Sequence, residues 1–328
     1  MIKINNLSIE YLKNRRPVKA VENISLDILE NETIALVGES GCGKSTLALA
    51  IIGLVSENGG RISGSIMFEN TDITALSKKQ WQALRGKEIS IIFQDPFSSL
   101  NPVMTVGNQL DEAIRTHNRG ISGQKVKELA VKALYEVMLD ERIYDSYPHQ
   151  LSGGQRQRML IAMAIANKPK LLIADEPTTA LDVTIQKEIL DLLDKIKKEH
   201  NLTLMLITHN LPLAKERCNR IAVMYAGKIV ELASAAEIFK HPRHPYTGAL
   251  IESIPKMRKT PATAAASGKN MLSGQPPAID NMPPGCRFHP RCSKVMDICK
   301  KKEPGIYDVS GVKVQCWLYQ MNRDPGKS

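Results

Sequence analysis

Short, largely apolar runs alternate with longer segments of helical periodicity over the first 255 residues of the chain. Four of these runs predict strands of a sheet that is buried on both faces, because few polar residues interrupt them. They are Ile34–Val37, Ile89–Phe93, Leu171–Ala174 and Leu204–Thr208. Strands that alternate with helices predict an α/β fold around a mainly parallel sheet.

Three other segments have different patterns. Residues 2–37 alternate apolar and polar positions and predict short strands joined by polar turns. Residues from about 103 to 147 show helical patterning without a strong strand, so we expect a helical insertion there. Residues 256–285 contain five prolines and the run Ala262–Ser267, which together indicate a linker or an irregular strap. The chain has no internal repeat, so we expect a single catalytic unit.

The composition supports a folded protein. Of the 328 residues, 43% are apolar, which is enough for a core and excludes wholesale disorder. The longest apolar run, Leu47–Val55, has nine residues if Gly53 is counted, whereas a membrane-spanning helix needs about 20. The first ten residues lack the basic and then apolar order of a signal peptide. We therefore expect a cytoplasmic protein.

The net charge of +10 is concentrated in the last quarter of the chain. Residues 241–328 hold 14 lysines and arginines against 6 acidic residues, whereas residues 1–240 hold 30 against 28. The body of the protein is thus not a polycation built for nucleic acid. The basic tail is suited to a phosphate group or an acidic membrane surface, or it is a solvated basic face.

A phosphate-binding motif follows the first predicted buried strand. Gly38–Ser45 matches G-x-x-x-x-G-K-[ST] between a strand and a helix, the context that the motif requires. The glycines let backbone N–H groups face phosphate oxygens, Lys44 supplies a positive charge, and the Ser45 hydroxyl is a ligand for Mg²⁺. The alternative is a glycine turn with an incidental lysine. The predicted ATP-binding residues here are Ser40, Gly41, Cys42, Gly43, Lys44, Ser45 and Thr46.

Two adjacent carboxylates end another predicted strand. Asp175 and Glu176 follow the apolar run Leu171–Ala174. At the edge of the sheet beside the phosphate loop, Asp175 is suited to hold Mg²⁺, and Glu176 to orient or deprotonate an attacking water. A solvated acidic turn is the alternative, and the phosphate loop upstream argues against it.

The sequence Leu151-Ser152-Gly153-Gly154-Gln155 stands between these two motifs and resembles the signature of the ATP-binding cassette (ABC) family. Ser152 is suited to cap a helix, and the two glycines open its N-terminus to an anion. Taken alone, the segment is also an ordinary helix cap with a glycine turn.

The resemblance covers residues 1–255 and implies a P-loop NTPase of the ABC cassette type. Such a cassette has a RecA-like, mainly parallel sheet core, an N-terminal antiparallel β subdomain and a helical subdomain, which would lie at about residues 96–160. Residues 256–328 would form a C-terminal extension containing cysteines. In that family the signature closes over ATP bound to the other subunit of a head-to-tail dimer. Five residues therefore match a trans site: Ser152, Gly153, Gly154, Gln155 and Asp182.

The remaining landmarks of the family appear in order. Gln94 matches a glutamine that senses Mg²⁺ and water, and His209 matches a histidine that contacts the γ-phosphate. Asp182 lies in the segment Ala180–Asp182, which matches a loop that couples the two ATP sites across the dimer. It could also simply cap the following helix. Tyr11, with Val18 as a weaker neighbour, matches the aromatic residue that stacks on adenine, although it could be an ordinary strand residue. The resemblance thus implies Glu176, His209 and Gln94 as catalytic residues, and Ser45, Gln94 and Asp175 around Mg²⁺.

Two segments of the tail narrow the resemblance. His244–Leu250 and Pro283–Cys292 resemble the C-terminal extension of peptide-importer ATPases, the dipeptide, oligopeptide and nickel branch of ABC importers. This implies an ATPase subunit on the cytoplasmic face of the inner membrane. Its partners would be two transmembrane permease subunits and a paralogous ATPase or a second copy, with an external substrate-binding protein acting indirectly. Motion would reach the permease through Pro96–Asn101 and Val103–Ile114.

Four cysteines lie close together in the tail with the spacing C-x5-C-x6-C-x16-C: Cys286, Cys292, Cys299 and Cys316. Thiolates are ligands for iron–sulfur clusters and zinc, but zinc sites usually contain a C-x₂₋₄-C pair, which is missing here. With the resemblance, the spacing favours a [4Fe–4S] cluster in a structural role. Zinc and free thiols remain alternatives, and His289 could replace one cysteine. Cys218 is expected in the core.

The rival hypothesis is an ABC-type ATPase that acts on nucleic acid or ribosomes. The basic tail and a metal site would suit it. The single cassette and the nearly neutral body argue against it, so we expect no nucleic-acid partner.

Overall fold

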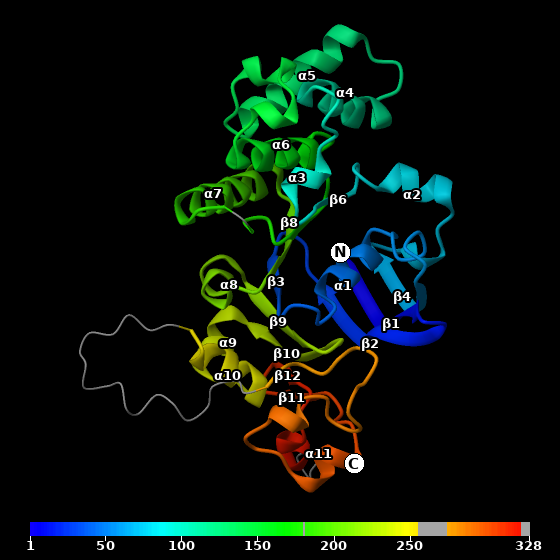
Figure 1. Cartoon of the computed structure of the whole chain (residues 1–328), viewed down its shortest axis with the longest axis vertical. Coiled ribbons are helices and arrows are strands. Elements are labelled where there is room, and N and C mark those ends of the chain that lie inside the picture. Colours follow the sequence, from blue (N-terminus) through cyan, green and yellow to red (C-terminus); the bar gives the residue numbers. More distant parts are fainter. Residues whose placement is uncertain (180, 255–273, 323–328) are drawn as a thin grey trace, which may run out of the picture.

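The computed structural model of the chain describes residues 1–179, 181–254 and 274–322. Its centre is an eight-stranded sheet in the order β11-β12-β10-β9-β3-β8-β7-β6 (Figure 1). The strands β9, β3, β8, β7 and β6 run parallel, each to its neighbour. Their bounds are β3 Thr33–Val37, β6 Ile89–Ile92, β7 Leu171–Asp175, β8 Thr203–Thr208 and β9 Arg220–Tyr225. The four predicted strands coincide with β3, β6, β7 and β8 to within one residue at each end.

The sheet is buried on both faces, which explains the apolar runs. Along β3, Ile34 and Leu36 belong to one buried cluster, and Ala35 and Val37 to another. Since successive side chains of a strand point to opposite faces, each face of the sheet has its own core. The first cluster includes buried residues of α1 Lys44–Ile51 and of the N-terminal strands. The second includes buried residues of most of the other helices.

The N-terminal segment forms a second, antiparallel sheet of four strands, in the order β2-β1-β4-β5. They are β1 Ile2–Lys13, β2 Arg16–Ile28, β4 Arg61–Phe68 and β5 Thr71–Asp72. The prediction of short strands over residues 2–37 was wrong for the first two strands, because β1 and β2 have 12 and 13 residues. Irregular register, as between Ile4 and Leu7, interrupts the alternation that a long strand would show.

Only helices lie between β6 and β7, as predicted for this insertion. They are α3 Pro96–Ser99, α4 Val106–His117, α5 Gly123–Glu136 and α6 Gly153–Ile165, with short 3₁₀ turns between α5 and α6. In Figure 1, α4, α5 and α6 lie at one end of the molecule, beyond the edge of the sheet. The remaining helices of the cassette are α2 Lys78–Leu84, α7 Val183–His200, α8 Leu211–Arg217, α9 Ala235–Lys240 and α10 Pro245–Glu252.

The C-terminal segment extends the main sheet at the opposite end of the molecule (Figure 1). The hairpin of β11 Tyr307–Val309 and β12 Val312–Val314 pairs antiparallel with β10 Lys228–Ser234, and α11 Asp297–Lys301 precedes it. The apolar pattern did not predict these strands, because three-residue strands are too short to show alternation. Of the predicted linker, residues 256–273 lie outside the described residues. Residues 274–285 are irregular, and Asp280 forms an ion pair with Lys13 at 2.6 Å.

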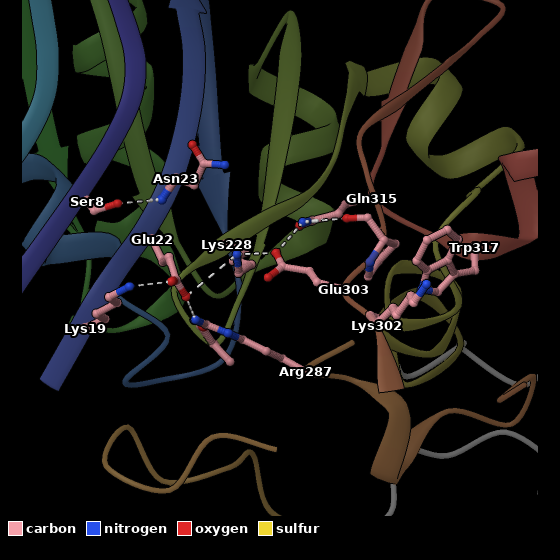
Figure 2. Close-up of polar contacts among 12 residues, drawn as sticks. Ser8, Lys19, Glu22, Asn23, Lys228, Arg287, Lys302, Glu303, Gln315 and Trp317 are labelled. Atoms are coloured by element: carbon pink, nitrogen blue, oxygen red, sulfur yellow. Dashed lines mark hydrogen bonds and ion pairs between the residues drawn. The ribbon is translucent and has the colours of Figure 1, made fainter. Parts of the chain in front are cut away.

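Several polar contacts fasten this segment to the cassette. Figure 2 shows an ion pair between Arg287 and Glu22 and another between Lys228 and Glu303. Lys228 Nζ also lies 3.8 Å from Glu22 Oε2. Gln315 donates a hydrogen bond to Glu303 at 2.9 Å. The C-terminal segment is thus attached by paired charges as well as by strand pairing. Within the described residues, every helix is too short or too polar to cross a membrane.

Candidate functional site

The loop between β3 and α1 needs glycine at its two ends. A Cβ on Gly38 would lie 2.2 Å from the carbonyl oxygen of Met224. Gly43 caps α1 with a φ of 104°, in the left-handed region, and a Cβ there would lie 2.7 Å from the carbonyl oxygen of Ala20. The loop therefore takes the curled conformation that directs backbone N–H groups inward and is suited to bind an anion.

A cavity of about 540 Å³ lies over this loop. Ser40, Gly41, Gly43, Lys44, Ser45 and Thr46 line it, together with Gln94, Glu176, His209, Ala20 and Ile279. Most of the predicted ATP-binding residues and all three predicted catalytic residues thus meet in one place. Ala20 and Ile279 were not predicted, since an isolated apolar residue gives no signal in the sequence.

Two predicted ATP-binding residues do not line this cavity. Cys42 is buried behind the loop, and burial raises the pKa of its thiol. Tyr11 is half-buried, and its ring lies close to Gly60, where an added Cβ would be 2.8 Å from the ring. Its neighbour across the hairpin is Val18. Stacking of Tyr11 on adenine stays a prediction.

Lys44 is buried at the base of the cavity, with 6% of its surface exposed. Its Nζ donates hydrogen bonds to the carbonyl oxygens of Gly38 at 2.9 Å and Glu39 at 3.0 Å. The ammonium group is therefore held inside the loop, and no carboxylate of the described residues forms an ion pair with it. A buried cation in this position favours a bound anion.

Asp175 and Ser45 are placed to hold a divalent cation. Asp175 is buried at the end of β7, and its Oδ1 has no hydrogen-bond partner. Burial raises the pKa of this carboxyl, while a hydrogen bond with Ser45 opposes the shift. A buried carboxylate oxygen without a partner, next to a hydroxyl, is suited to Mg²⁺, which prefers oxygen ligands. The donor set therefore fits the predicted ion.

Glu176 is held by three side chains. Its Oε2 accepts hydrogen bonds from Gln94 Nε2 at 3.1 Å and Thr179 Oγ1 at 3.0 Å, and its Oε1 lies 3.3 Å from His209 Nδ1. The residue has a φ of 47°, in the left-handed region, and its N–H donates to the carbonyl of Ile207 at 2.9 Å. This strained backbone directs the carboxylate into the cavity. Thr179 was not predicted as a site residue, and its position three residues after Glu176 was the available signal in the sequence.

The predicted signature residues do not line the cavity of their own chain. Ser152 caps α6, and Gln155 returns the contact in a capping box. A Cβ on Gly154 would lie 3.0 Å from Ile185, so this glycine lets α6 approach α7 closely. Asp182 caps α7, and its Oδ1 accepts from the N–H of Ile185 at 3.0 Å. Ser152 and Asp182 therefore do cap helices. Contact of either residue with ATP would need a nucleotide held by another subunit.

The four cysteines of the tail lie near one another as free thiols. The N–H of Cys286 donates to the carbonyl of Cys299 at 2.8 Å. Burial raises the pKa of Cys286 to about 11 and that of Cys316 to about 12, and repulsion from the other thiols adds to both shifts. Within the part of the chain that the structure describes, no three His, Cys, Asp or Glu side chains are arranged to hold a metal ion. Neither the predicted cluster nor zinc is thus supported by a preformed site. Cys218 is buried in the core, as predicted.

The motif that begins at His244 packs against the C-terminal segment. His244 caps α10, and its Nδ1 accepts from the N–H of Tyr246 at 3.1 Å. Burial lowers the pKa of His244 to about 3, so the ring is neutral. Glu231, fully buried on β10, accepts from the N–H groups of Arg243 and His244. Phe288 packs on Tyr246 at 5.4 Å between ring centroids. The two tail motifs thus form one aromatic cluster.

Two segments of the chain match models of known protein families. Residues 21–179 match the model of the family described as ABC transporter, and residues 230–299 match the one described as oligopeptide/dipeptide transporter, C-terminal region. The chain is 43% identical to the oligopeptide transport ATP-binding protein AppD of Bacillus subtilis, over 98% of this chain and 97% of AppD. The chain belongs to the ABC transporter ATP-binding proteins of the oligopeptide/dipeptide importer type.

Other members of this family are about as similar. The chain is 44% identical to the dipeptide transport ATP-binding protein DppD of Haemophilus influenzae, over 96% of this chain and 94% of that protein. Among solved structures, a dimeric post-hydrolysis state of the ATP-binding cassette MJ0796 bound to ADP and Pi is 30% identical. It has a TM-score of 0.64 and covers 72% of this chain and 99% of that chain. The P-loop NTPase fold of the ABC cassette is thereby confirmed.

Proposed function

We propose that this ABC ATPase hydrolyses ATP to power the import of dipeptides or oligopeptides through a membrane permease. The observation that carries the ATPase activity is the meeting of Lys44, Glu176 and His209 around one cavity. The peptide cargo is supported by the named functions of AppD and DppD. The same relatives favour this function over the nucleic-acid alternative.

The geometry is suited to in-line attack of water on the γ-phosphate. The phosphate loop and Lys44 would bind the triphosphate. Ser45, Asp175 and Gln94 would hold Mg²⁺, which would offset the charge of the phosphates. The water oxygen forms a bond to the γ-phosphorus, and the bond from that phosphorus to the bridging oxygen of ADP breaks. Glu176 Oε accepts the proton of the water, while Gln94 and Thr179 keep the carboxylate in place. His209, 65% exposed, lines the cavity and would contact the γ-phosphate of a bound ATP.

Two ATPase subunits are needed to complete each site. Ser152 and its neighbours lie outside the cavity of their own chain, so they are available to ATP held by a facing subunit. The MJ0796 cassette, which is dimeric with ADP and Pi, supports a head-to-tail pair. We propose a paralogous ATPase as the facing subunit, with a second copy of this chain as the alternative.

The permease would contact the helical insertion on the cytoplasmic face of the membrane. Phe97 and Val103 are large apolar side chains of this insertion and are 60% and 79% exposed, so both are accessible to a partner. They lie in the segments 96–101 and 103–114 that the resemblance assigns to coupling. We propose that residues 1–255 form the cassette, with its helical subdomain at about 96–160, and that residues 256–328 form the extension.

A reconstituted transporter tests this function. We expect the ATPase activity of the chain, assembled with permease and paralogue in proteoliposomes, to rise several-fold when a peptide-loaded binding protein is supplied. Radiolabelled peptide should accumulate in the vesicles only with ATP. Stimulation by duplex DNA or ribosomes, and none by the permease, would instead support the rival function.

We also propose that the four thiols of the tail ligate a [4Fe–4S] cluster with a structural role, zinc being the alternative. Support comes from the spacing of the four cysteines along the chain and from their closeness in the fold, where Cys286 and Cys316 each interact electrostatically with the other cysteines of the group. We expect anaerobically purified protein to be brown, to contain about four irons per chain and to absorb near 400 nm. Cys292→Ser should lose the colour, whereas Cys218→Ser should keep it. Stoichiometric zinc without iron would contradict the cluster.

A further inference from the structure

One side chain of the C-terminal extension reaches the phosphate loop. Arg291 lies in the turn His289–Arg291, one residue before Cys292. Its Nη1 donates to Glu39 Oε2 at 2.7 Å, and its Nη2 donates to Glu39 Oε1 at 2.9 Å. Glu39 is the second residue of the phosphate loop. This pairing is bidentate and charge-assisted, the strongest kind of side-chain hydrogen bonding, and it joins positions 252 residues apart.

Both partners are fixed by further contacts. The side chain of Arg291 is 6% exposed, and its guanidinium lies over the ring of Tyr225, 5.8 Å from the centroid. The hydrogen bond to Glu39 raises the pKa of Arg291 further above its usual range. The backbone N–H of Glu39 donates to the hydroxyl of Tyr246 at 3.1 Å. The extension, the motif of α10 and the loop therefore meet at Glu39.

Glu39 is also connected to the groups that bind phosphate. Its carbonyl oxygen accepts from Lys44 Nζ, and the next residue, Ser40, lines the cavity. A carboxylate beside a triphosphate site would repel the ligand, because like charges at short range weaken binding. Glu39 does not line the cavity, and Arg291 holds its carboxylate with two hydrogen bonds.

We propose that Arg291 is a positioning residue of the nucleotide site: it neutralises Glu39 and holds that carboxylate away from the bound triphosphate. This inference rests on the proposed ATP binding, and it means that a residue of the extension affects the affinity for ATP. Arg291 does not contact the cavity, so it acts on ATP through Glu39 and the loop.

A second ion pair between the extension and the cassette provides a matched control variant. Glu303 pairs with Lys228 in the network of Figure 2, and Lys228 retains Glu22 as a neighbour. Glu303→Gln therefore removes an ion pair between the extension and the cassette without changing a charge on the phosphate loop. If Arg291 only fastened the extension, the two variants would act alike.

Calorimetric titration of the purified full-length chain with Mg·ATP tests the proposal. We expect Arg291→Gln to bind ATP about tenfold more weakly, and this defect to shrink at high salt, because salt screens the repulsion from Glu39. Glu39→Gln, the second single variant of the cycle, should lose far less affinity than Arg291→Gln, because it removes the repelling charge itself. The double variant should recover most of the lost affinity, since it lacks the charge that Arg291 neutralises. Glu303→Gln should bind as wild type does.

Thermal melting checks that each variant is folded. Should Arg291→Gln fail to fold, Arg291→Lys takes its place, because it keeps the charge and loses the bidentate geometry; we expect about threefold weaker binding. Unchanged affinity in the Arg291 variants, or a double variant as weak as the single one at every salt concentration, would overturn the proposal. A wild-type chain that does not bind ATP would instead contradict the proposed function.

Discussion

Glu176→Gln is expected to lower ATP turnover at least about 100-fold while ATP binding is kept, because a general base typically contributes a factor of 10² to 10⁴. Glutamine has nearly the same shape as glutamate, so it can still meet Gln94 and Thr179, which now contact the carboxylate. It cannot accept the proton of the attacking water. The hydrolytic step would stop with ATP bound, and the two subunits would stay closed around it.

Phosphate release and Mg·ATP affinity, measured on the assembled transporter, check this expectation. Glu199→Gln is the matched control, since Glu199 lies on the exposed face of α7 with half of its side chain in solvent. Turnover within about threefold of wild type in Glu176→Gln would remove Glu176 from its proposed function.

Lys44→Met is expected to weaken ATP binding about 100-fold, which corresponds to about 2.7 kcal/mol. Methionine keeps the length of the aliphatic stem, so the buried space inside the loop stays filled. The ammonium group is lost, however, and with it the only lysine or arginine among the residues that line the described cavity. The negative charge of the phosphates would then be offset mainly by backbone N–H groups and Mg²⁺.

The affinity for Mg·ATP and for Mg·ADP should be measured for both this variant and Lys195→Ala. Lys195 lies on α7, half exposed, 3.8 Å from Glu199, and its removal should leave both affinities unchanged. Equal ATP affinity in Lys44→Met and wild type would show that the phosphates bind elsewhere.

Much of the fold and the site was predictable because the relevant signals are local. Buried parallel strands need apolar side chains on both faces, and β3 shows this in the four successive residues Ile34–Val37. The phosphate loop likewise needs glycine where a Cβ would strike Met224. Short-range constraints of this kind leave a pattern in neighbouring residues, which a single sequence is enough to show.

Contacts between distant segments left no such pattern. Arg291 and Glu39 are far apart in the chain, and each alone is an ordinary charged residue. The hairpin β11–β12 joins the sheet through three-residue strands whose alternation is too short to recognise. Ile279 reaches the cavity from an irregular segment. These features depend on tertiary packing, so they can be recognised only in the three-dimensional structure.

We propose that one chain supplies only half of each ATP site and that the capped helix α6 of a facing subunit supplies the other half. A structure of the assembled transporter carrying Glu176→Gln, with Mg·ATP bound, tests it most directly. We expect Ser152 Oγ and the N–H groups that follow it to lie within hydrogen-bond distance, about 3.5 Å or less, of the γ-phosphate held by the other ATPase. A closed, ATP-loaded assembly in which Ser152 contacts no nucleotide would contradict it.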